Sequence, residues 1–236
     1  MPEHRTTAPP QDPSHDLTDD TRPDTTANTE QETTMAEPTT IHLIRHGTTL
    51  LNRANRYRGR RDVPLDAGGW QDAWSAAGAL HDAGLVAIYS SPCRRARDTA
   101  RIVADAAGLE HVVDLPGLVN LDYGRWEGLT SEEAAALHPE EYGAYQRYAA
   151  GAFCPEGEAL DVAARRMVLS VETLALLHPG GTVAAVSHAA MLRLLIAEVT
   201  TTPRAEWRHN LPNGSISTFS VDADGTVVLV SAPVAA

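Results

Sequence analysis

Lysine is absent from this sequence of 236 residues, so all nineteen basic side chains are arginines. Acidic residues number 31, and the formal net charge is -12. A surface of that sign repels phosphate groups, so we expect no binding to nucleic acid or to anionic membranes.

Long apolar runs and cysteine pairs are also missing. No run approaches the roughly 20 residues that a membrane-spanning helix needs. The two cysteines, Cys93 and Cys154, do not have the spacing of a metal-binding pair. We expect two buried thiols, with a disulfide as the alternative, and a cytoplasmic protein without a membrane partner.

Residues 1–38 lack the apolar side chains of a folded domain. They carry nine acidic residues against Arg5 and Arg22, and Leu17 is their only large aliphatic residue besides two methionines. Such a segment cannot bury enough apolar surface to offset its ordering entropy. We therefore predict a disordered acidic tail over residues 1–38 and a domain over residues 39–236. The tail has no signal-peptide pattern, and Met35 is an alternative start.

From residue 40 onward, strand-like and helix-like segments alternate. Asp66 is a candidate N-cap, Gly108 a candidate helix stop, and Asp224-Gly225 a hairpin turn. Strands separated by helices predict a three-layer α/β/α sandwich with a mostly parallel central sheet. The expected strands cover residues 41–44, 84–92, 111–115 and 182–188, and the expected helices cover residues 66–81, 92–107, 157–178 and 189–199, with another beginning at 131.

Polar clusters follow the predicted strands, at residues 45–48, 91–97, 120–128 and 187–188. Ligands of parallel sheets bind beyond the carboxyl ends of the strands. Arginines and histidines there offer the forked donors that a phosphate needs, and a histidine can also act as a nucleophile. A single histidine after a strand is more often structural, so the combination of clusters carries the prediction.

Six stretches in order resemble the motifs of the histidine phosphatase superfamily, which has the phosphoglycerate mutase-like fold. The likeness runs from about residue 40 to residue 220. The stretches are "LIRHGTTLLN", "RYRGRRDVPLDAGGWQDA", "SPCRRARDTA", "LDYGRWEGLTSEE", "PEGEALDVAARRM" and "VAAVSHAAMLR".

The resemblance implies a metal-independent phosphoryl transfer site without a cofactor. His46 matches the nucleophile that forms a phosphohistidine intermediate. Arg45, Arg95 and His188 match the residues that hold the phosphoryl oxygens, and Asn52 matches a further polar contact. Fixed positive charge is what phosphoryl transfer depends on. Metal ligation by the two histidines is the alternative, but no carboxylate has a suitable spacing.

Three other motif positions concern the substrate. Thr48 follows the first motif and is a candidate substrate contact. Ala189 replaces the usual glycine after the second histidine, and its methyl group narrows the rim of the predicted pocket. Asn120 stands where many members carry the glutamate that protonates the leaving group, and an amide cannot donate a proton in this way. Asp122 and Glu127 are the alternative acids, or else Asn120 binds a substrate hydroxyl.

The segment of residues 130–155 is expected to shape the specificity pocket. Tyr145 and Tyr148 are predicted to share a helix face, either as core residues or as a surface for stacking. Tyr142 and Phe153 lie in the same segment, and Arg147 is a candidate for binding a second anionic group.

We expect a phosphatase that hydrolyses a small phosphomonoester or an activated phosphate. Two alternatives remain open. The first is a catalytically weak relative that binds phosphorylated ligands or protein partners. The second is a phosphomutase, for which the short segment between Thr130 and Pro155 leaves little room. The partner is a small phosphorylated substrate, and the protein is a monomer or a homodimer.

Overall fold

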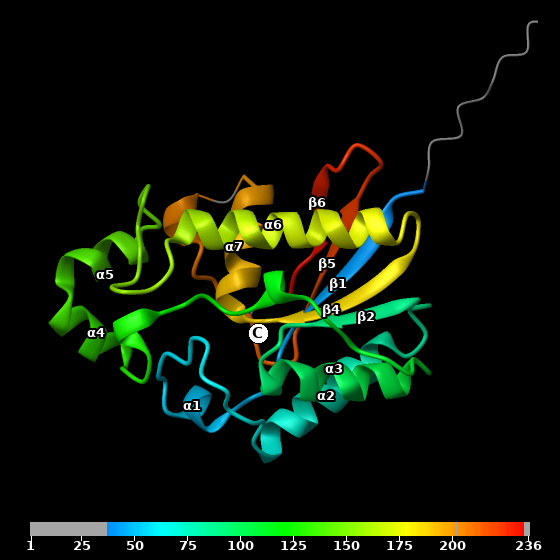
Figure 1. Cartoon of the computed structure of the whole chain (residues 1–236), viewed down its shortest axis with the longest axis horizontal. Coiled ribbons are helices and arrows are strands. Elements are labelled where there is room, and N and C mark those ends of the chain that lie inside the picture. The colour runs from blue at the N-terminus through cyan, green and yellow to red at the C-terminus, as the bar shows by residue number, and fades with distance from the viewer. Residues whose placement is uncertain (1–36, 202, 234–236) are drawn as a thin grey trace, which may run out of the picture. The chain divides into compact units, whose positions relative to one another are not determined.

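A computed structural model describes residues 37–201 and 203–233. Most of the predicted acidic tail, residues 1–36, lies outside the described residues, as does the alternative start at Met35. The described residues contain one six-stranded sheet in the order β3-β2-β4-β1-β5-β6 (Figure 1). Its strands are β1 (Thr39–Arg45), β2 (Ala87–Ser90), β3 (Val113–Asp114), β4 (Thr182–Ser187), β5 (Ile216–Val221) and β6 (Val227–Ser231).

The sheet is mostly parallel, as predicted. Strands β1 to β4 pair in parallel, and of the six strands only β5 runs against the others. The antiparallel hairpin of β5 and β6 turns at residues 222–226, which include the predicted Asp224-Gly225. Strand β1 pairs with β4 so that Arg45 lies opposite Ser187. This register brings the residues that follow both strands together at one edge of the sheet.

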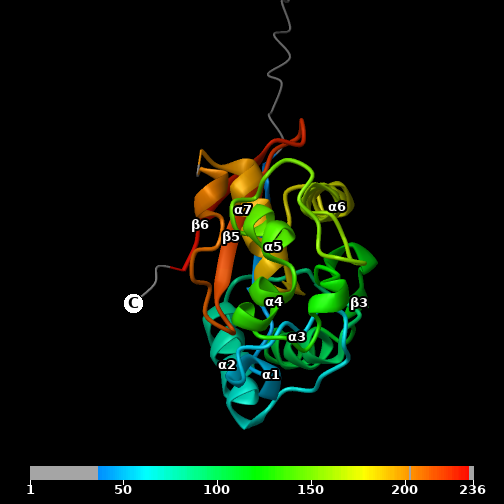
Figure 2. The same ribbon diagram turned by 90° about the vertical axis from the view of Figure 1, so that its left-hand side faces the viewer.

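Helices cover both faces of the sheet, which confirms the three-layer prediction (Figure 2). Alternate residues of β1 point to opposite faces. Ile41 and Leu43 join a core with α6 and α7, whereas Ile44 joins a core with α2 and α3. The α-helices are α1 (Leu50–Arg53), α2 (Ala67–Leu80), α3 (Arg94–Ala106), α4 (Ser131–Leu137), α5 (Pro139–Gln146), α6 (Leu160–Leu177) and α7 (Ala189–Val199).

Four predicted elements were too long. Strand β2 spans Ala87–Ser90 instead of residues 84–92. Strand β3 has only two residues, Val113 and Asp114, at one edge of the sheet, where they pair with β2. Helix α3 begins at Arg94 instead of residue 92, since Cys93 has extended backbone and serves as its N-cap. Helix α6 begins at Leu160 instead of residue 157, because a turn at Glu156 with φ of 58° precedes it.

Two local predictions are confirmed, the N-cap at Asp66 and the two buried thiols. Asp66 caps α2 by accepting a hydrogen bond from the Gly69 N–H group (2.9 Å). Cys93 and Cys154 are free and buried. Within the described part of the chain, no helix combines the length and the apolar character needed to cross a membrane.

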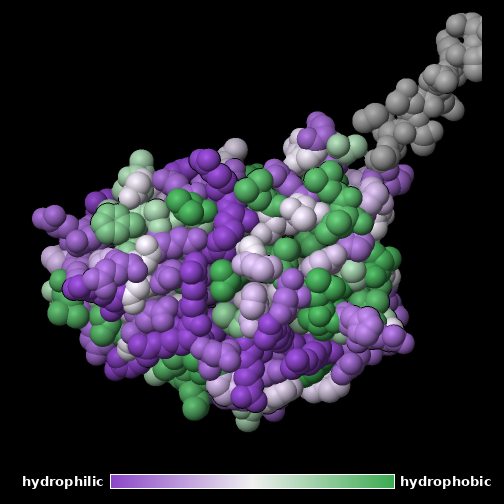
Figure 3. Space-filling model, viewed as in Figure 1, coloured by the Kyte–Doolittle hydropathy of each residue, from purple (hydrophilic) through white to green (hydrophobic). Residues whose placement is uncertain are grey.

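Helices α4 and α5 lie beyond the carboxyl end of the sheet, on the same side as α1 (Figure 1). The space-filling view from this side shows hydrophilic residues gathered across the middle of the face (Figure 3). An isolated bridge between Arg56 and Thr130 connects the segment after α1 to the start of α4. These segments form the walls above the ends of β1 and β4, where the polar clusters meet.

Candidate active site

His46 lies directly after β1 and is held on two sides. Its backbone N–H group donates to the Ser187 carbonyl (3.0 Å), and its ring Nδ1 lies 2.6 Å from the Gly47 carbonyl oxygen. A carbonyl can only accept, so Nδ1 carries the hydrogen and Nε2 is unprotonated. The fold therefore presents Nε2 as the reactive atom.

The loop after His46 needs glycine because α2 approaches it closely. A Cβ atom on Gly47 would lie 2.2 Å from the Gly69 carbonyl oxygen, and one on Gly69 would lie 2.1 Å from the Thr48 carbonyl oxygen. No side chain fits between these backbones. The pair of glycines thus sets the position of the catalytic loop against α2.

His46 is fully buried among positive charges, and its pKa lies well below the usual 6.5. The largest cause is burial, which disfavours the imidazolium form, followed by repulsion from Arg95, Arg58 and Arg45. The ring is therefore neutral at physiological pH and available as a nucleophile.

Arg95 connects the two histidines from the first turn of α3. Its Nε donates to His46 Nε2 (3.3 Å), and its Nη2 donates to His188 Nδ1 (3.2 Å). Nη1 and Nη2 also donate to the carbonyls of Arg61 (2.7 Å) and Gly59 (2.9 Å). Neutral acceptors hold this fully buried guanidinium, and it belongs to none of the ion pairs found among the described residues, although Asp62 and Glu127 act on it from further away.

His188 follows β4 and completes the cluster. Because His188 Nδ1 accepts a hydrogen bond from Arg95, the ring hydrogen is on Nε2, which donates to Ser91 Oγ (2.8 Å). Burial, followed by Arg95 and His46, holds the pKa of His188 well below its ordinary value. The rings of His46 and His188 lie edge to face, with centroids 5.1 Å apart.

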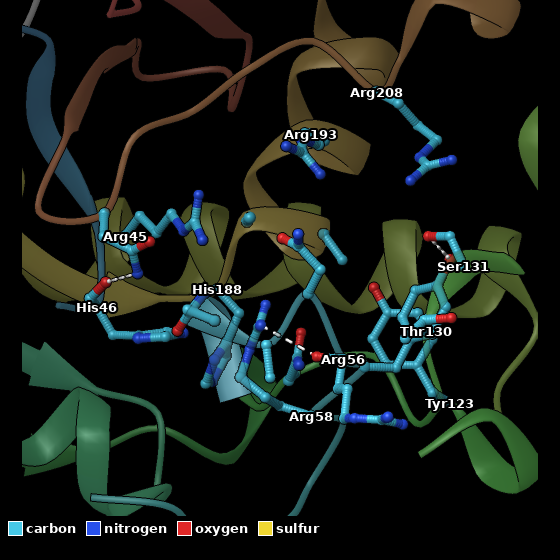
Figure 4. A pocket seen from close by; sticks show the side chains of 18 of the residues that line it. Arg45, His46, Arg56, Arg58, Tyr123, Thr130, Ser131, His188, Arg193 and Arg208 are labelled. Carbon is cyan, nitrogen blue, oxygen red and sulfur yellow. Dashed lines mark hydrogen bonds between the residues drawn. The ribbon is translucent and has the colours of Figure 1, made fainter. Parts of the chain in front are cut away.

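A cavity of about 640 Å³ opens above the two histidines (Figure 4). Its lining includes five arginines but, among the described residues, only one carboxylate, that of Glu132. Six of the eight predicted site residues line it, namely Arg45, His46, Asn52, Asn120, His188 and Ala189. Arg95 lies behind the lining, in contact with both histidines. A cationic cavity of this kind suits a phosphorylated ligand.

Thr48 is not part of the cavity lining. Its N–H group and its hydroxyl both donate to Asp72 Oδ2 of α2, at 2.8 and 2.6 Å. The geometry gives Thr48 a structural contact, and the predicted substrate contact is not supported. Asn52 does line the cavity, although its Oδ1 accepts hydrogen bonds from the N–H group and the hydroxyl of Thr49 at the start of α1.

Asn120 lies in the cavity wall with one half of its amide satisfied. Its Nδ2 donates to the Gly59 carbonyl (3.1 Å), and its buried Oδ1 has no hydrogen-bond partner. The alternative acids point elsewhere. Asp122 forms an ion pair with Arg60, Glu127 forms one with Arg61, and neither carboxylate lines the cavity.

Sequence reasoning missed four arginines of the cavity. Arg56 follows α1 and forms an ion pair with Glu133. Arg58 comes from the loop after α1, Arg193 from α7 and Arg208 from the segment before β5. Arg193 lies five residues after His188, on a helix that begins at the site. This spacing could have predicted that Arg193 lies near the cavity. Arg58 and Arg208 come from irregular segments whose course the sequence pattern does not reveal. The predicted second-anion residue, Arg147, is exposed and does not line the cavity.

The aromatic segment forms mainly core. Tyr145 and Tyr148 are both buried in the core on the α6 side of the sheet. They do not share a helix face, because Tyr148 follows the end of α5 and has a φ of 48°. Tyr145 also reaches the cavity, whereas Phe153 is 49% exposed outside it.

Comparisons with known proteins agree with this geometry. The family model described as the histidine phosphatase superfamily (branch 1) matches residues 41–232 of the sequence. A bifunctional protein of Mycobacterium tuberculosis is 39% identical over 67% of the chain, and the match spans 43% of that relative's length. A metal-independent phosphoserine phosphatase of Arabidopsis thaliana is 34% identical, over 70% of each chain.

Among solved structures, the fold is similar to that of a mycobacterial glucosyl-3-phosphoglycerate phosphatase in complex with VO3. It is 27% identical, has a TM-score of 0.74, and the match covers 83% of this chain and 99% of that one.

Proposed function

The chain belongs to the histidine phosphatase superfamily, and we propose that it hydrolyses a small phosphomonoester or an activated phosphate through a phosphohistidine on His46. The observation that supports this proposal most is the neutral His46 Nε2 at the base of an arginine-rich cavity. An unprotonated imidazole nitrogen beside fixed positive charge is the arrangement that phosphoryl transfer to histidine needs.

The reaction takes two displacements at phosphorus. In the first, the Nε2 lone pair of His46 forms the N–P bond while the bond from phosphorus to the leaving oxygen breaks. The phosphoryl oxygens take over the hydrogen bonds that Arg95 makes with the histidines, and Arg45 adds a second cation. In the second, water attacks phosphorus, the N–P bond breaks, and His46 is regenerated with release of phosphate and a proton.

Arg45 is prepared for an anion. Its side chain is buried, one Nη group donates to the Leu211 carbonyl, and its Nε has no partner. Burial, followed by repulsion from Arg58 and Arg193, lowers the pKa of Arg45 to about 9. A bound phosphate relieves both effects, because it supplies the missing acceptor and the missing negative charge.

Asn120 determines which leaving groups depart quickly. The amide cannot protonate an alkoxide, and general acid catalysis is typically worth ~10²–10⁴-fold. The leaving groups of aryl, acyl and other activated phosphates depart without that proton, so these phosphates are the favoured substrates. The unpaired Oδ1 of Asn120 is suited to accept a hydrogen bond from a substrate hydroxyl instead.

Steady-state hydrolysis of p-nitrophenyl phosphate and of an alkyl phosphate tests the proposal, with His46→Ala as the control. We expect turnover of the aryl ester, much slower turnover of the alkyl ester, and none in the control. Equal rates for wild type and control would overturn the phosphatase proposal and favour binding without turnover. Transfer to an added alcohol in place of water would favour a mutase. The cytoplasmic location and the oligomeric state stay predictions.

A further inference from the structure

The cavity contains a second group of arginines, Arg58, Arg193 and Arg208, besides Arg45 and the ion-paired Arg56. Their contacts are with neutral groups. Arg58 donates to the Arg56 carbonyl (3.2 Å), Arg193 donates to the His209 carbonyl (2.7 Å), and Arg208 lies 5.5 Å from the centroid of the Tyr145 ring. Among the ion pairs of the described residues, none includes these three side chains.

Two of these side chains also keep a buried donor without an acceptor. The Nε atoms of Arg58 and Arg208 are buried and have no hydrogen-bond partner. A buried donor left unpaired costs free energy that a suitable ligand recovers on binding. Burial, the largest cause, lowers the pKa of Arg58 to about 10, and Arg95 and Arg193 add repulsion. The group is therefore a set of charges that lacks its counter-ion.

The second group runs outward from the histidines, with Arg58 close to His46 and Arg208 at the far end. Repulsion on His46 comes from Arg95, Arg58 and Arg45, whereas the interactions of Arg208 are with Tyr145, Tyr57 and Tyr142. Arg193 interacts with Arg45 on one side and with Arg208 on the other. Figure 4 shows the same order in space, with Arg193 between Arg45 and Arg208.

We propose that the substrate carries a second oxyanion, and that Arg58, Arg193 and Arg208 bind it while the phosphoryl group lies at His46. The proposal rests on the proposed function, since that function places the phosphoryl group at the histidines. The substrate class is thus a phosphate ester whose other end bears a carboxylate or a second phosphate. A ligand with one anionic group would leave at least two arginines of the cavity unpaired.

A general attraction for anions is the competing explanation. Positive potential in a cavity raises the affinity for every anion, whatever the number of its charged groups. A built site for a second oxyanion acts only on ligands that reach it. The two explanations therefore differ in the ratio of affinities for ligands with two anionic groups and with one.

Calorimetric binding of non-hydrolysable phosphonates to the full chain measures this ratio without any turnover. The probes are methylphosphonate, a series of phosphonocarboxylates and a series of alkane bisphosphonates. We expect the best two-anion probe to bind at least about tenfold more tightly than methylphosphonate, as charge-assisted hydrogen bonds imply. The better of the two series identifies the second oxyanion as a carboxylate or a phosphate.

Arg208→Met tests the site itself, because methionine keeps much of the apolar stem and removes the donors. We expect the ratio to fall by about tenfold in Arg208→Met and to stay unchanged in Arg147→Met, an exposed arginine outside the cavity. Arg193→Gln provides a second variant, and thermal unfolding confirms that each protein folds.

A ratio near one in the wild type would overturn the proposal, and so would equal losses for all probes in Arg208→Met. If the protein hydrolyses no ester but keeps the ratio, the proposed function fails while the two-anion site holds.

Discussion

Arg95 Nη2 donates a hydrogen bond to His188 Nδ1 at 3.2 Å, from a guanidinium whose Nε also contacts His46. The two histidines come from strands far apart in the sequence, and the parallel pairing of β1 with β4 brings them together. One buried cation thus fixes the orientation of both rings before any ligand binds.

Replacing Arg95 with lysine tests this fixed geometry. Lysine keeps the charge but cannot donate to two rings and two carbonyls at once. We expect kcat/KM for p-nitrophenyl phosphate to fall by about 10²–10³-fold in Arg95→Lys, the usual cost of losing a positioned donor. Arg94→Lys is the matched control, since Arg94 is an exposed neighbour that pairs with Asp98. Similar losses in both variants would contradict the role of Arg95.

Exchange of Asn120 tests the missing proton donor. Asn120→Glu places a carboxylic acid in the cavity wall, where it can protonate the leaving oxygen. We expect the rate of alkyl ester hydrolysis, relative to the aryl ester, to rise by at least about tenfold. Asn120→Gln has the same length as the glutamate but cannot donate that proton, so its ratio should stay low. A similar rise in both variants would contradict the explanation.

The low pKa values of His46 and His188 predict a pH-dependent stability. Both values lie below the ordinary 6.5 in the folded protein, so the unfolded chain binds these protons first as the pH falls. The stability that the neutral rings confer is present above pH 6.5 and is lost below it. The free energy of unfolding should therefore fall by about 1.4 kcal/mol per pH unit for each such histidine.

Urea unfolding measured at several values between about pH 7.5 and pH 5 gives the dependence of the free energy of unfolding on pH. We expect a shallower slope in His188→Gln, where one of the two titrating rings is gone. His111→Gln removes an exposed histidine and should keep the slope of the wild type. Identical slopes in all three proteins would contradict the low pKa values.

The glycines of α2 offer a test of the loop contact. Gly69→Ala places a methyl group against the Thr48 carbonyl, and we expect destabilisation of about 1–3 kcal/mol together with reduced activity. Gly78→Ala on the same helix meets no atom within 4 Å and should stabilise the protein by about 0.5–1 kcal/mol. Chemical unfolding compares the two. Opposite signs are expected, and a neutral Gly69→Ala would contradict the close contact.

The sequence predicted the elements of the fold well because their signals are local. The apolar run before Arg45, the cap at Asp66 and the hairpin at residues 222–226 each depend on a few neighbouring residues. Boundaries at turns were harder to predict. Tyr148 has a left-handed backbone that its residue type does not signal, and its ring packs against Trp207, which is distant in the sequence.

The candidate site was only partly predictable. His46, Arg95 and His188 belong to motifs at strand ends, whose meeting point follows from parallel pairing. Arg58 and Arg208 enter the cavity from irregular segments, and no periodicity places such residues in space. The exposed Arg147 was selected for its nearness in sequence to the tyrosines, which does not determine where its side chain lies.

Trapping the phosphoenzyme tests the central claim most directly. The full chain would be mixed with radiolabelled p-nitrophenyl phosphate and quenched in alkali, and the labelled peptide would be sequenced by mass spectrometry. We predict an acid-labile, alkali-stable phosphoryl group on His46 that is absent from His46→Ala. Turnover of the ester with a label on another residue, or with no label at all, would contradict nucleophilic catalysis by His46.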